Sequence, residues 1–334
     1  MYIFTICSNN YLGQAIALGN SVNSQNPEYK FSIFLCDEKS ELIDYSLIKH
    51  NIIEIGIIEP RIYELAKKYN IIELNTAVKP KIFQYIFEIT GVNKAMYLDP
   101  DIFVYNSLSG LERELNTNST LLTPHIFNSI PHDGKTPSEN TFLNYGIYNL
   151  GFLALKRDDN TKQLLNWWKN ITYNICFIQP ANGIFVDQLP MNMAPLFFSG
   201  VKIITDVGYN MAPWNLHERR LEQTNNEYIV NGNTTLKFYH FSSFNFDSLE
   251  LPNHYNRYNL AERSDLLVIY QNYQNELIQC KFQMYKTVPC VFVKIRNQEI
   301  SATQKLLWEE KSLLQKTVSL AKKYAPSRLK QILK

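Results

Sequence analysis

Two carboxylates one residue apart interrupt an apolar stretch of the chain. Asp99 and Asp101 lie within Ala95-Met-Tyr-Leu-Asp-Pro-Asp-Ile-Phe-Val-Tyr105. Because an unpaired buried carboxylate costs several kcal/mol, these two should face a cation or a network of hydrogen-bond donors. Hard divalent ions such as Mg²⁺ and Mn²⁺ bind carboxylate and phosphate oxygens together. The pair therefore predicts a metal site that would offset the charge of a departing phosphate, although Asp-Pro-Asp is also ordinary turn chemistry.

The elements that must position this pair alternate between strands and helices. Apolar runs predict strands over 2–7, 31–36, 52–55 and 94–98. Helical spacing predicts helices over 11–23, 62–69 and 81–89. The alternation favours βαβ units and an α/β fold with a mostly parallel sheet. In such sheets ligands bind beyond the carboxyl ends of the strands, which is where Ser8, Asp37 and Asp99 fall.

The second half of the chain is less regular, and its end is helical. The pattern predicts short strands over 120–123, 151–155, 202–205, 227–230 and 235–240, and a helix over 158–173. Helical spacing takes over from about residue 260. We therefore expect a catalytic domain over 1–255 and a helical C-terminal extension over 256–334.

The extension ends in a basic amphipathic segment. Leu307, Leu314, Val318 and Ala321 recur at helical spacing. No acidic residue follows Glu310, whereas seven basic ones do: Lys311, Lys316, Lys322, Lys323, Arg328, Lys330 and Lys334. Such a segment suits an anionic membrane surface, and equally a helix docked on the body with a solvated basic face.

The composition excludes several classes of protein. Of the 334 residues, 45% are hydrophobic and 19% charged, which predicts a packed core rather than disorder. The 33 Lys and Arg nearly balance the 31 Asp and Glu, so we expect no nucleic-acid partner. The five cysteines lack metal-ligand spacing and predict reduced thiols in a cytoplasmic protein. No apolar stretch approaches the ~18 residues of a membrane span, and no signal peptide is expected.

The order of the motifs resembles that of the GT-A glycosyltransferases, and most of all the family 8 group that includes lipooligosaccharide galactosyltransferases and glycogenin. In that family an N-terminal strand leads into residues that contact a nucleotide-sugar donor. A basic residue on a helix then precedes the Asp-x-Asp strand, and a late His completes the metal site. The resemblance spans about residues 1–245 and implies a GT-A fold.

The resemblance, with the strand-end position of Asp37, assigns roles to individual residues. Donor binding falls to Thr5, Cys7, Ser8, Asn9, Asn10, Asp37, Lys79 (with Lys81 as the alternative), Asp99 and Gly151. The metal ligands would be Asp99, Asp101 and His240. The residues around the reacting sugar would be Asn149, in Asn-Leu-Gly151, and the pair Asp187-Gln188.

Two segments depart from the family pattern. The Lys and Trp that the family carries shortly after its metal-binding His have no match in Ser242-Ser-Phe-Asn-Phe-Asp-Ser-Leu249. The segment 211–220 has no counterpart, and its polar and aromatic members are candidates for an acceptor or phosphate site: Trp214, His217, Arg219 and Arg220. The polar stretch 125–140 predicts a loop over the donor.

The resemblance implies a metal-dependent glycosyltransferase that uses Mn²⁺ or Mg²⁺. Its donor would be a nucleotide diphosphate sugar, UDP-linked, and its acceptor a glycan or glycolipid in bacterial cell-surface polysaccharide or lipooligosaccharide assembly. Lys79 would add positive charge where the leaving group develops negative charge. Retention of configuration is favoured, and an inverting enzyme would use Asp187 as its base. The protein is expected in the cytoplasm, with peripheral contact at the inner face of the membrane if the basic tail binds lipid.

Other interpretations of the same residues stay open at this point. His240 on an apolar strand also fits a satisfied core residue, and Asp187 also fits a helix cap. A haloacid dehalogenase-type phosphohydrolase carries Asp-x-Asp at a strand end, with Asp158-Asp159 as a later acidic pair, but here an apolar strand continues after Asp101. The third alternative is a non-catalytic nucleotide-sugar-binding partner of a glycan assembly complex.

Overall fold

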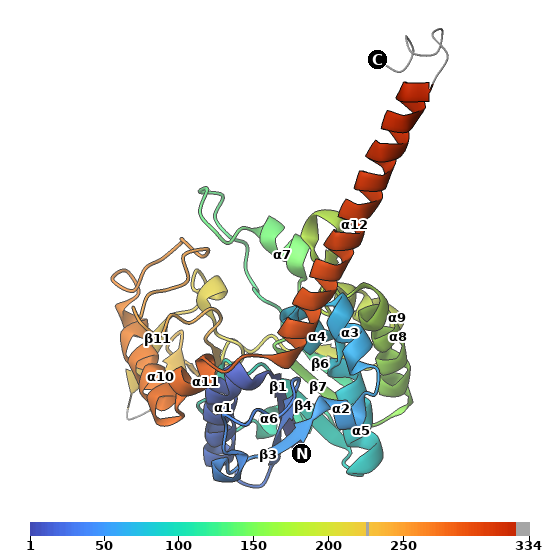
Figure 1. Ribbon diagram of the computed structural model, residues 1–334. Helices are drawn as coiled ribbons and strands as arrows, with labels where there is room; N and C mark the ends of the chain where they lie inside the picture. The colour runs from blue at the N-terminus through green and yellow to red at the C-terminus, as the bar shows by residue number, and fades with distance from the viewer. Residues whose placement is uncertain (225–226, 325–334) are drawn as a thin grey trace.

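A central sheet organises the computed structural model, which describes residues 1–224 and 227–324 (Figure 1). Within that part of the chain the sheet has seven strands, in the order β10 (Val201–Ile203), β6 (Thr120–Leu122), β7 (Phe152–Lys156), β4 (Lys94–Leu98), β1 (Tyr2–Cys7), β2 (Lys30–Leu35) and β3 (Asn51–Glu54). β7 is antiparallel to both of its neighbours, and the other neighbouring pairs are parallel. The predicted α/β fold with a mixed, mostly parallel sheet is confirmed.

Alternating side chains of β1 contribute to two cores, one on each face of the sheet. Every residue of β1 is buried, as expected for a central strand covered on both sides. Phe4 packs on one face in the same core as Phe83 and Trp168. Ile3 packs on the other face in the same core as Leu18. This two-sided burial explains why the N-terminal strand is apolar at every position except Thr5.

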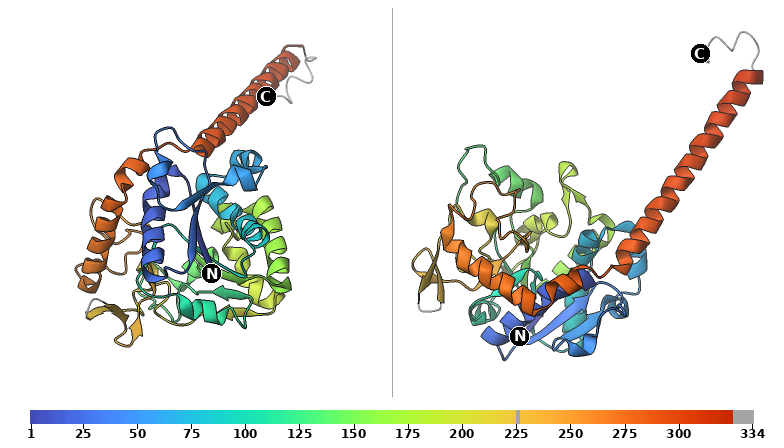
Figure 2. Two further views of the ribbon diagram at one scale, coloured as in Figure 1. Left: turned by 90° about the horizontal axis from the view of Figure 1, so that it is seen from below. Right: turned by 60° about the vertical axis from the view of Figure 1, so that its left-hand side comes forward.

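Helices cover both faces of the sheet (Figure 2). The core that contains Phe4 is completed by α3 (Ile62–Lys68), α4 (Ile71–Ala77), α5 (Lys79–Ile89) and α8 (Asp159–Ile175). The core that contains Ile3 is completed by α1 (Leu12–Gln25) and α6 (Ser109–Glu114). The predicted helix over 158–173 is found as α8, which Asp158 caps by accepting a hydrogen bond of 2.9 Å from Thr161 N.

Smaller elements surround the sheet. The short helices are α2 (Ile55–Ile58), α7 (Glu139–Tyr145) and α9 (Ala194–Phe197). The 3₁₀ turns are η1 (Asn9–Tyr11), η2 (Tyr45–Leu47), η3 (Pro180–Asn182), η4 (Leu189–Met193), η5 (Pro213–Asn215) and η6 (Ser264–Leu266). The remaining strands pair as β5 (Ile102–Val104) with β14 (Phe238–His240), β8 (Ile178–Gln179) with β9 (Ile184–Phe185), and β11 (Leu221–Thr224) with β12 (Glu227–Val230) and β13 (Thr234–Thr235).

Within the described residues, three α-helices follow β14: α10 (Leu267–Gln279), α11 (Phe282–Lys286) and α12 (Val291–Tyr324). α10 packs into a third core together with residues of the preceding strand, and the rings of Phe241 and Tyr273 stack with centroids 3.8 Å apart. This core joins residues on both sides of the boundary expected at 255, and the division into two domains stays a prediction.

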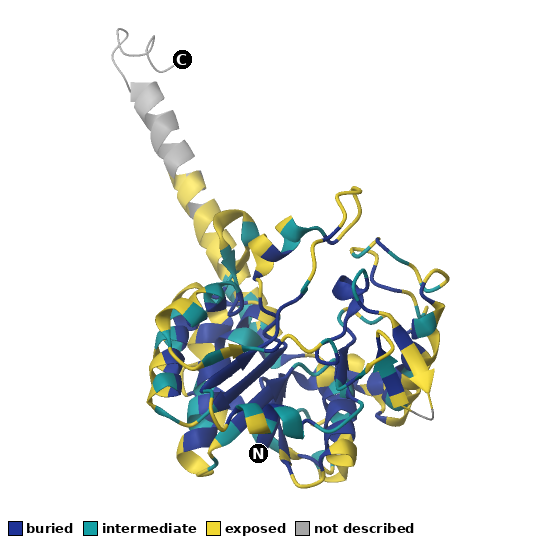
Figure 3. Cartoon of the chain, turned by 180° about the vertical axis from the view of Figure 1, so that it is seen from behind, coloured by how far each residue is buried: buried dark blue, intermediate teal, exposed yellow. Residues whose placement is uncertain are grey.

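The last helix, α12, leaves the body after its first turns (Figures 1 and 2). Its start packs against the body through the rings of Phe292 and Tyr63, which contact edge-on with centroids 5.7 Å apart. Farther along, its described side chains are exposed, including Leu306 at 61% and Trp308 at 70% (Figure 3). Of the predicted basic face, Arg328, Lys330 and Lys334 lie outside the described residues. Among the described helices, none combines the length and the apolar character needed to span a membrane.

Candidate active site

The two carboxylates of the Asp-Pro-Asp sequence lie in a turn between β4 and β5. Ile102 N donates a hydrogen bond of 3.0 Å to the carbonyl of Asp99, which closes the turn. Asp99 N in turn donates to the carbonyl of Gly151 at 2.8 Å, so the turn is tied to the start of β7. Both aspartates are half-buried. The turn chemistry and the metal-site chemistry therefore coexist in the same three residues.

His240 reaches the carboxylates because β14 pairs with β5. The antiparallel register sets His240 opposite Ile102, one residue beyond Asp101. His240 Nε2 lies 3.1 Å from Asp101 Oδ1 and 3.8 Å from Asp99 Oδ2. The three potential ligand atoms lie within 4.8 Å of one another. Two carboxylate oxygens and an imidazole nitrogen at this spacing form a donor set that can hold one divalent ion.

Gly151 is required by the close approach of these ligands. A Cβ atom at this position would lie 2.5 Å from His240 Cε1 and 2.7 Å from Asp99 Oδ2. Any side chain would therefore push the ligands apart. Gly151 thus leaves the space in which His240 and Asp99 approach each other, and its predicted contact with the donor stays a prediction.

Lys79 and Asp187 form a buried ion pair next to the ligand cluster. Their charged atoms are 2.7 Å apart, and each side chain is only 2% exposed. Lys79 also donates to the carbonyl of Leu150 at 2.9 Å, and its Nζ lies 4.2 Å from the centre of the Tyr97 ring. The hydroxyl of Tyr97 donates to Asp99. This chain of contacts connects the ion pair to the candidate metal ligands.

Gln188 and Asn149 bind the backbone and side chains that surround the ion pair. Gln188 Oε1 accepts from Leu150 N at 3.0 Å, and its Nε2 donates to the carbonyl of Tyr145 at 2.7 Å. The Asn149 amide lies between two histidines, at 3.3 Å from His240 Nδ1 and 3.3 Å from His125 Nε2. The structure thus brings the three residues predicted around the sugar, and the three predicted ligands, into one network.

The electrostatics of this network favour a cation. Burial raises the pKa of Asp187 and of Asp99, and it outweighs the opposing attraction of Lys79. Burial also lowers the pKa of His240, but the carboxylates of Asp101 and Asp99 outweigh this and leave it above its usual value. Counted without His240, three ionised carboxylates and one ammonium leave an excess of two negative charges, which one divalent cation would neutralise.

The residues predicted at the end of β1 form a second cluster. Asn9 Nδ2 donates to Asp37 at 3.0 Å, and Val291 N donates to the other Asp37 oxygen at 2.9 Å. Burial raises the pKa of Asp37. Ser8 Oγ donates to Asn10 at 2.6 Å. Four of the predicted residues here have almost no exposed surface: Thr5 and Asn9 at 0%, and Cys7 and Ser8 at 1%.

Several residues of the network were not assigned to it by the sequence. Tyr97 lies on β4, two residues before Asp99, and side chains two apart along a strand point to the same side. This spacing is a signal that could have identified Tyr97. Trp214 packs edge-on against His240, with ring centres 5.0 Å apart.

Arg219, a candidate for phosphate binding, is instead buried and donates to the carbonyls of Val207 and Tyr209 at 3.2 and 2.7 Å.

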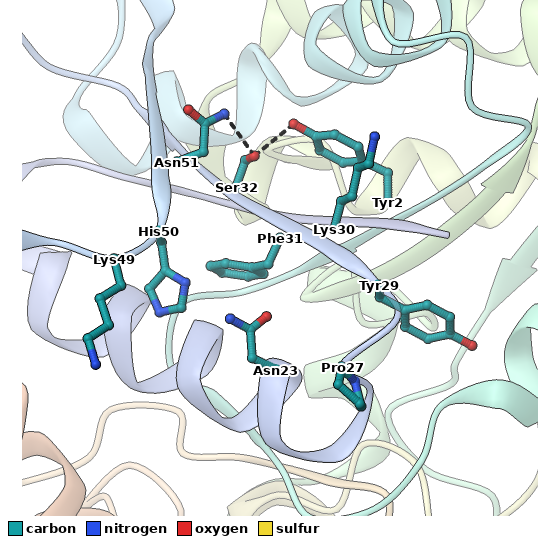
Figure 4. A pocket seen from close by; sticks show the side chains of 10 residues that line it. All are labelled: Tyr2, Asn23, Pro27, Tyr29, Lys30, Phe31, Ser32, Lys49, His50 and Asn51. Atoms are coloured by element: carbon teal, nitrogen blue, oxygen red, sulfur yellow. Dashed lines mark hydrogen bonds between the residues drawn. The ribbon is translucent and has the colours of Figure 1, made fainter.

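A hollow of about 520 Å³ lies at the opposite end of the sheet (Figure 4). Its lining residues surround the starts of β1, β2 and β3: Tyr2, Asn23, Pro27, Tyr29, Lys30, Phe31, Ser32, Lys49, His50 and Asn51. None of the predicted site residues is among them. The chemistry-bearing side chains gather instead at the carboxyl ends of the parallel strands, as the sheet topology predicts.

Comparison with known proteins assigns the chain to a family. Residues 2–242 match the sequence model of glycosyl transferase family 8, and the chain belongs to this family. It is 25% identical over 277 residues to the protein YfnF of Bacillus subtilis (strain 168), covering 82% of this chain and 90% of the relative. The YfnD protein of the same organism is 20% identical over 279 residues, covering 80% and 86%.

Solved glycosyltransferases resemble the structure more distantly. The galactosyltransferase LgtC, in complex with donor and acceptor sugar analogs, is 20% identical with a TM-score of 0.42, covering 64% of this chain and 76% of LgtC. The glycosyltransferase GlyE of Streptococcus pneumoniae TIGR4 is 14% identical with a TM-score of 0.46, covering 90% and 63%.

Family membership identifies the chain as a glycosyltransferase, and its fold is the GT-A fold that the resemblance implied. The predicted enzyme class is therefore confirmed. The phosphohydrolase alternative is not retained, because its Asp-x-Asp would serve a different chemistry on a different fold. The Asp-Asp-His cluster agrees with the divalent-metal dependence that is typical of the family.

Proposed function

We propose that this chain transfers a sugar from a nucleotide diphosphate donor, UDP-linked, to a glycan acceptor, with a divalent cation held by Asp99, Asp101 and His240. The observation that carries the proposal is the convergence of these three side chains at the end of β4, with ligand atoms within 4.8 Å of one another. Such an ion would offset the negative charge that develops on the departing diphosphate. The carboxylates suit Mn²⁺ and Mg²⁺, and the imidazole nitrogen favours Mn²⁺.

The chain's own residues would orient the donor. We assign Asp187 to the sugar hydroxyls and Gln188 to the neighbourhood of the anomeric carbon. Asp187 is held from two sides, because Lys79 binds its carboxylate at 2.7 Å and Trp168 Nε1 donates to its carbonyl at 3.0 Å. Lys79 adds a positive charge close to the leaving group. We propose retention of configuration, with Asp187 as the base if the product proves to be inverted.

The cluster at the end of β1 is proposed to bind the nucleotide. Asn10, which is half-buried, would contact it. Ser8 binds the Asn10 side chain at 2.6 Å, and Asp37 fixes the position of Asn9 through the 3.0 Å hydrogen bond. Thr5, Cys7, Ser8 and Asn9 are all 0–1% exposed, so we expect these four to support the segment.

Thermal unfolding tests the proposal directly. The chain is heated with a panel of UDP-, GDP- and ADP-sugars, with and without Mn²⁺. A ligand that binds the folded state raises its stability by mass action, by about 2.7 kcal/mol at a hundredfold excess over the Kd. We expect a Mn²⁺-dependent rise in Tm with one UDP-sugar, absent in Asp101→Asn and retained in the exposed control Asp247→Asn. No shift with any donor would contradict the proposal.

We further propose that the acceptor belongs to cell-surface polysaccharide or lipooligosaccharide assembly and that α12 meets the inner face of the membrane. Leu306, Leu307 and Trp308 are exposed by 61%, 51% and 70%, and Lys311 is exposed beside them. An amphipathic helix with apolar and basic side chains binds anionic lipid surfaces. Sedimentation with anionic vesicles is expected to carry the full chain down. Equal sedimentation with neutral vesicles, or none with either, would contradict this placement.

A further inference from the structure

Two buried histidines are joined through one amide side chain. His240 Nδ1 lies 3.3 Å from Asn149 Oδ1, and Asn149 Nδ2 lies 3.3 Å from His125 Nε2. The other nitrogen of His125 lies 3.2 Å from the carbonyl oxygen of Ile147. His125, Asn149 and His240 are 6%, 7% and 4% exposed. We call these three hydrogen-bonded side chains the relay. Because all three are buried, each of their hydrogen-bond donors must have an acceptor within the protein.

The chemistry of its first member gives the relay a direction. The carbonyl of Ile147 can only accept, so Nδ1 of His125 carries the hydrogen. Burial lowers the pKa of His125 to about 4, so the ring is neutral and its Nε2 must accept. Asn149 therefore donates through Nδ2 to His125, and its Oδ1 accepts from Nδ1–H of His240.

The opposite orientation of the Asn149 amide would break this pattern. It would turn Oδ1 toward His125 Nε2, which would then need a hydrogen of its own. Both nitrogens of His125 would be protonated, and an imidazolium would be buried with a carbonyl and an amide as its partners. The same flip would turn Nδ2 toward Nδ1 of His240 and remove that hydrogen. The two orientations thus predict opposite tautomers for His240.

We propose that His125 and Asn149 are positioning residues that hold His240 with its hydrogen on Nδ1 and its Nε2 lone pair directed toward the cation. The inference rests on the proposed metal function of His240, whose Nε2 lies 3.1 Å from Asp101. A histidine that ligates a metal usually donates its other N–H to a fixed acceptor, and loss of such an acceptor weakens metal affinity 10–100-fold. Asn149 is that acceptor here, and His125 orients Asn149.

Two other elements hold His125 in place. The ring of Phe142 in α7 stacks on the His125 ring with centroids 5.0 Å apart. The ring of Trp214 in η5 lies edge-on to the His125 ring, with centroids 5.3 Å apart. Its Nε1 donates to the His125 carbonyl at 3.1 Å. The predicted loop spanned 125–140; residues 126–138 have no helix or strand, but α7 begins within that stretch at Glu139. The packed His125 anchors the start of this segment. Folding of the loop and α7 is thereby coupled to the orientation of the metal ligand.

Calorimetric titration of the full chain with Mn²⁺ tests the relay. His125→Leu keeps the approximate volume but removes the acceptor, and we expect its Mn²⁺ affinity to fall about 10–100-fold. His125→Gln offers an amide oxygen near the place of Nε2 and should retain most of the affinity. Wild-type affinity in a folded His125→Leu, or equal loss in both variants, would overturn the proposal. Near-ultraviolet circular dichroism reports folding, because Trp214 contacts the substituted side chain.

A second measurement needs neither metal nor a core substitution. In ¹⁵N-histidine spectra of the unaltered chain at neutral pH, one neutral ring should show the Nδ1–H tautomer, and His125→Gln should abolish its signal. The Nε2–H tautomer for that ring would overturn the relay. If the unaltered chain binds no Mn²⁺, the proposed metal function fails, and the tautomer still decides the direction of the relay.

Discussion

The chain places charged side chains in two contrasting settings. At the carboxyl end of the sheet, Lys79 and Asp187 are 2% exposed and bind each other at 2.7 Å. Along α12, the described side chains beyond Ser301 are exposed to solvent (Figure 3). They include the charged residues Glu310 and Lys311. The first setting depends on every partner being present, because a buried charge without its partner is costly. The second tolerates change, because water replaces any lost contact.

The contrast separates two ways in which the protein can act on other molecules. In the buried network, fixed dipoles and paired charges act at short range, where little water screens them. On the exposed helix, charges and apolar side chains can act only by meeting another surface. Substitutions in the network should therefore change stability, metal binding and catalysis together. Changes in α12 beyond Ser301 should leave all three unaltered.

The largest effect on stability is expected from Lys79→Met. This substitution leaves the Asp187 carboxylate buried without its ion pair and removes the donor to Leu150. Removing one partner of a buried pair costs about 3–5 kcal/mol. The unfolding free energy from urea denaturation of the metal-free chain measures the loss.

Two variants isolate the cause of that loss. Lys81 lies on the same helix and is half-buried, so Lys81→Met should reduce the unfolding free energy far less. The double variant Lys79→Met/Asp187→Leu removes both charges and should recover much of the stability, because no unpaired charge remains. A double variant as unstable as Lys79→Met would show that the lysine acts through packing rather than through the ion pair.

Gly151→Ala should have the next largest effect. Its Cβ would fall 2.5 Å from His240 Cε1 and 2.9 Å from Asn149 Oδ1, so the ligands and the relay must shift. Overpacking of this kind costs about 1–3 kcal/mol. We expect Mn²⁺ affinity to fall more sharply than stability, which calorimetry and thermal unfolding measure separately. Gly56→Ala is the matched control, because its Cβ would meet nothing within 4 Å.

A smaller effect is expected from pH. Burial raises the pKa of Asp99 in the folded chain, so the folded state holds that proton more tightly than the unfolded state does. The resulting stability is complete below the unfolded pKa and is lost as pH rises through the folded pKa. In EDTA, the unfolding free energy should decline as Asp99 ionises, and Asp99→Asn should decline less. Parallel curves for the two proteins would show that Asp99 does not titrate with a raised pKa.

Much of this architecture follows from local sequence pattern. The run Tyr2–Cys7, apolar except at Thr5, predicts a strand because parallel strands buried on both faces are nearly all apolar. The strand ends of such a sheet then bring Asn9, Asp37 and Asp99 to one edge, although they are far apart in the chain. Asp99, Asp101 and His240 were predicted as ligands from the resemblance, and the structure brings them together.

The pairing of side chains could not be predicted in the same way. Lys79 and Asp187 are separated by more than a hundred residues, and their ion pair depends on how α5 packs against α8 and the segment after β9. His125 lies in a polar stretch that predicts a loop, and only the packing of Phe142 and Trp214 makes it a buried partner of Asn149. Periodicity identifies which face of an element is buried, but it does not identify the tertiary partner.

The smallest effect on the body is expected from ending the chain after Ser301. The contacts that attach the start of α12 remain, including Val291 N to Asp37 at 2.9 Å and Phe292 against Tyr63. The lost segment includes Leu306 and Trp308, which are exposed, so the unfolding free energy should change by no more than about 0.5 kcal/mol. Transfer to a water-soluble acceptor should be unchanged, while sedimentation with anionic vesicles should disappear. If the shortened chain instead unfolds at a clearly lower temperature, the helix stabilises the body in solution, and the contrast between a buried, interdependent site and an independent exposed helix does not hold.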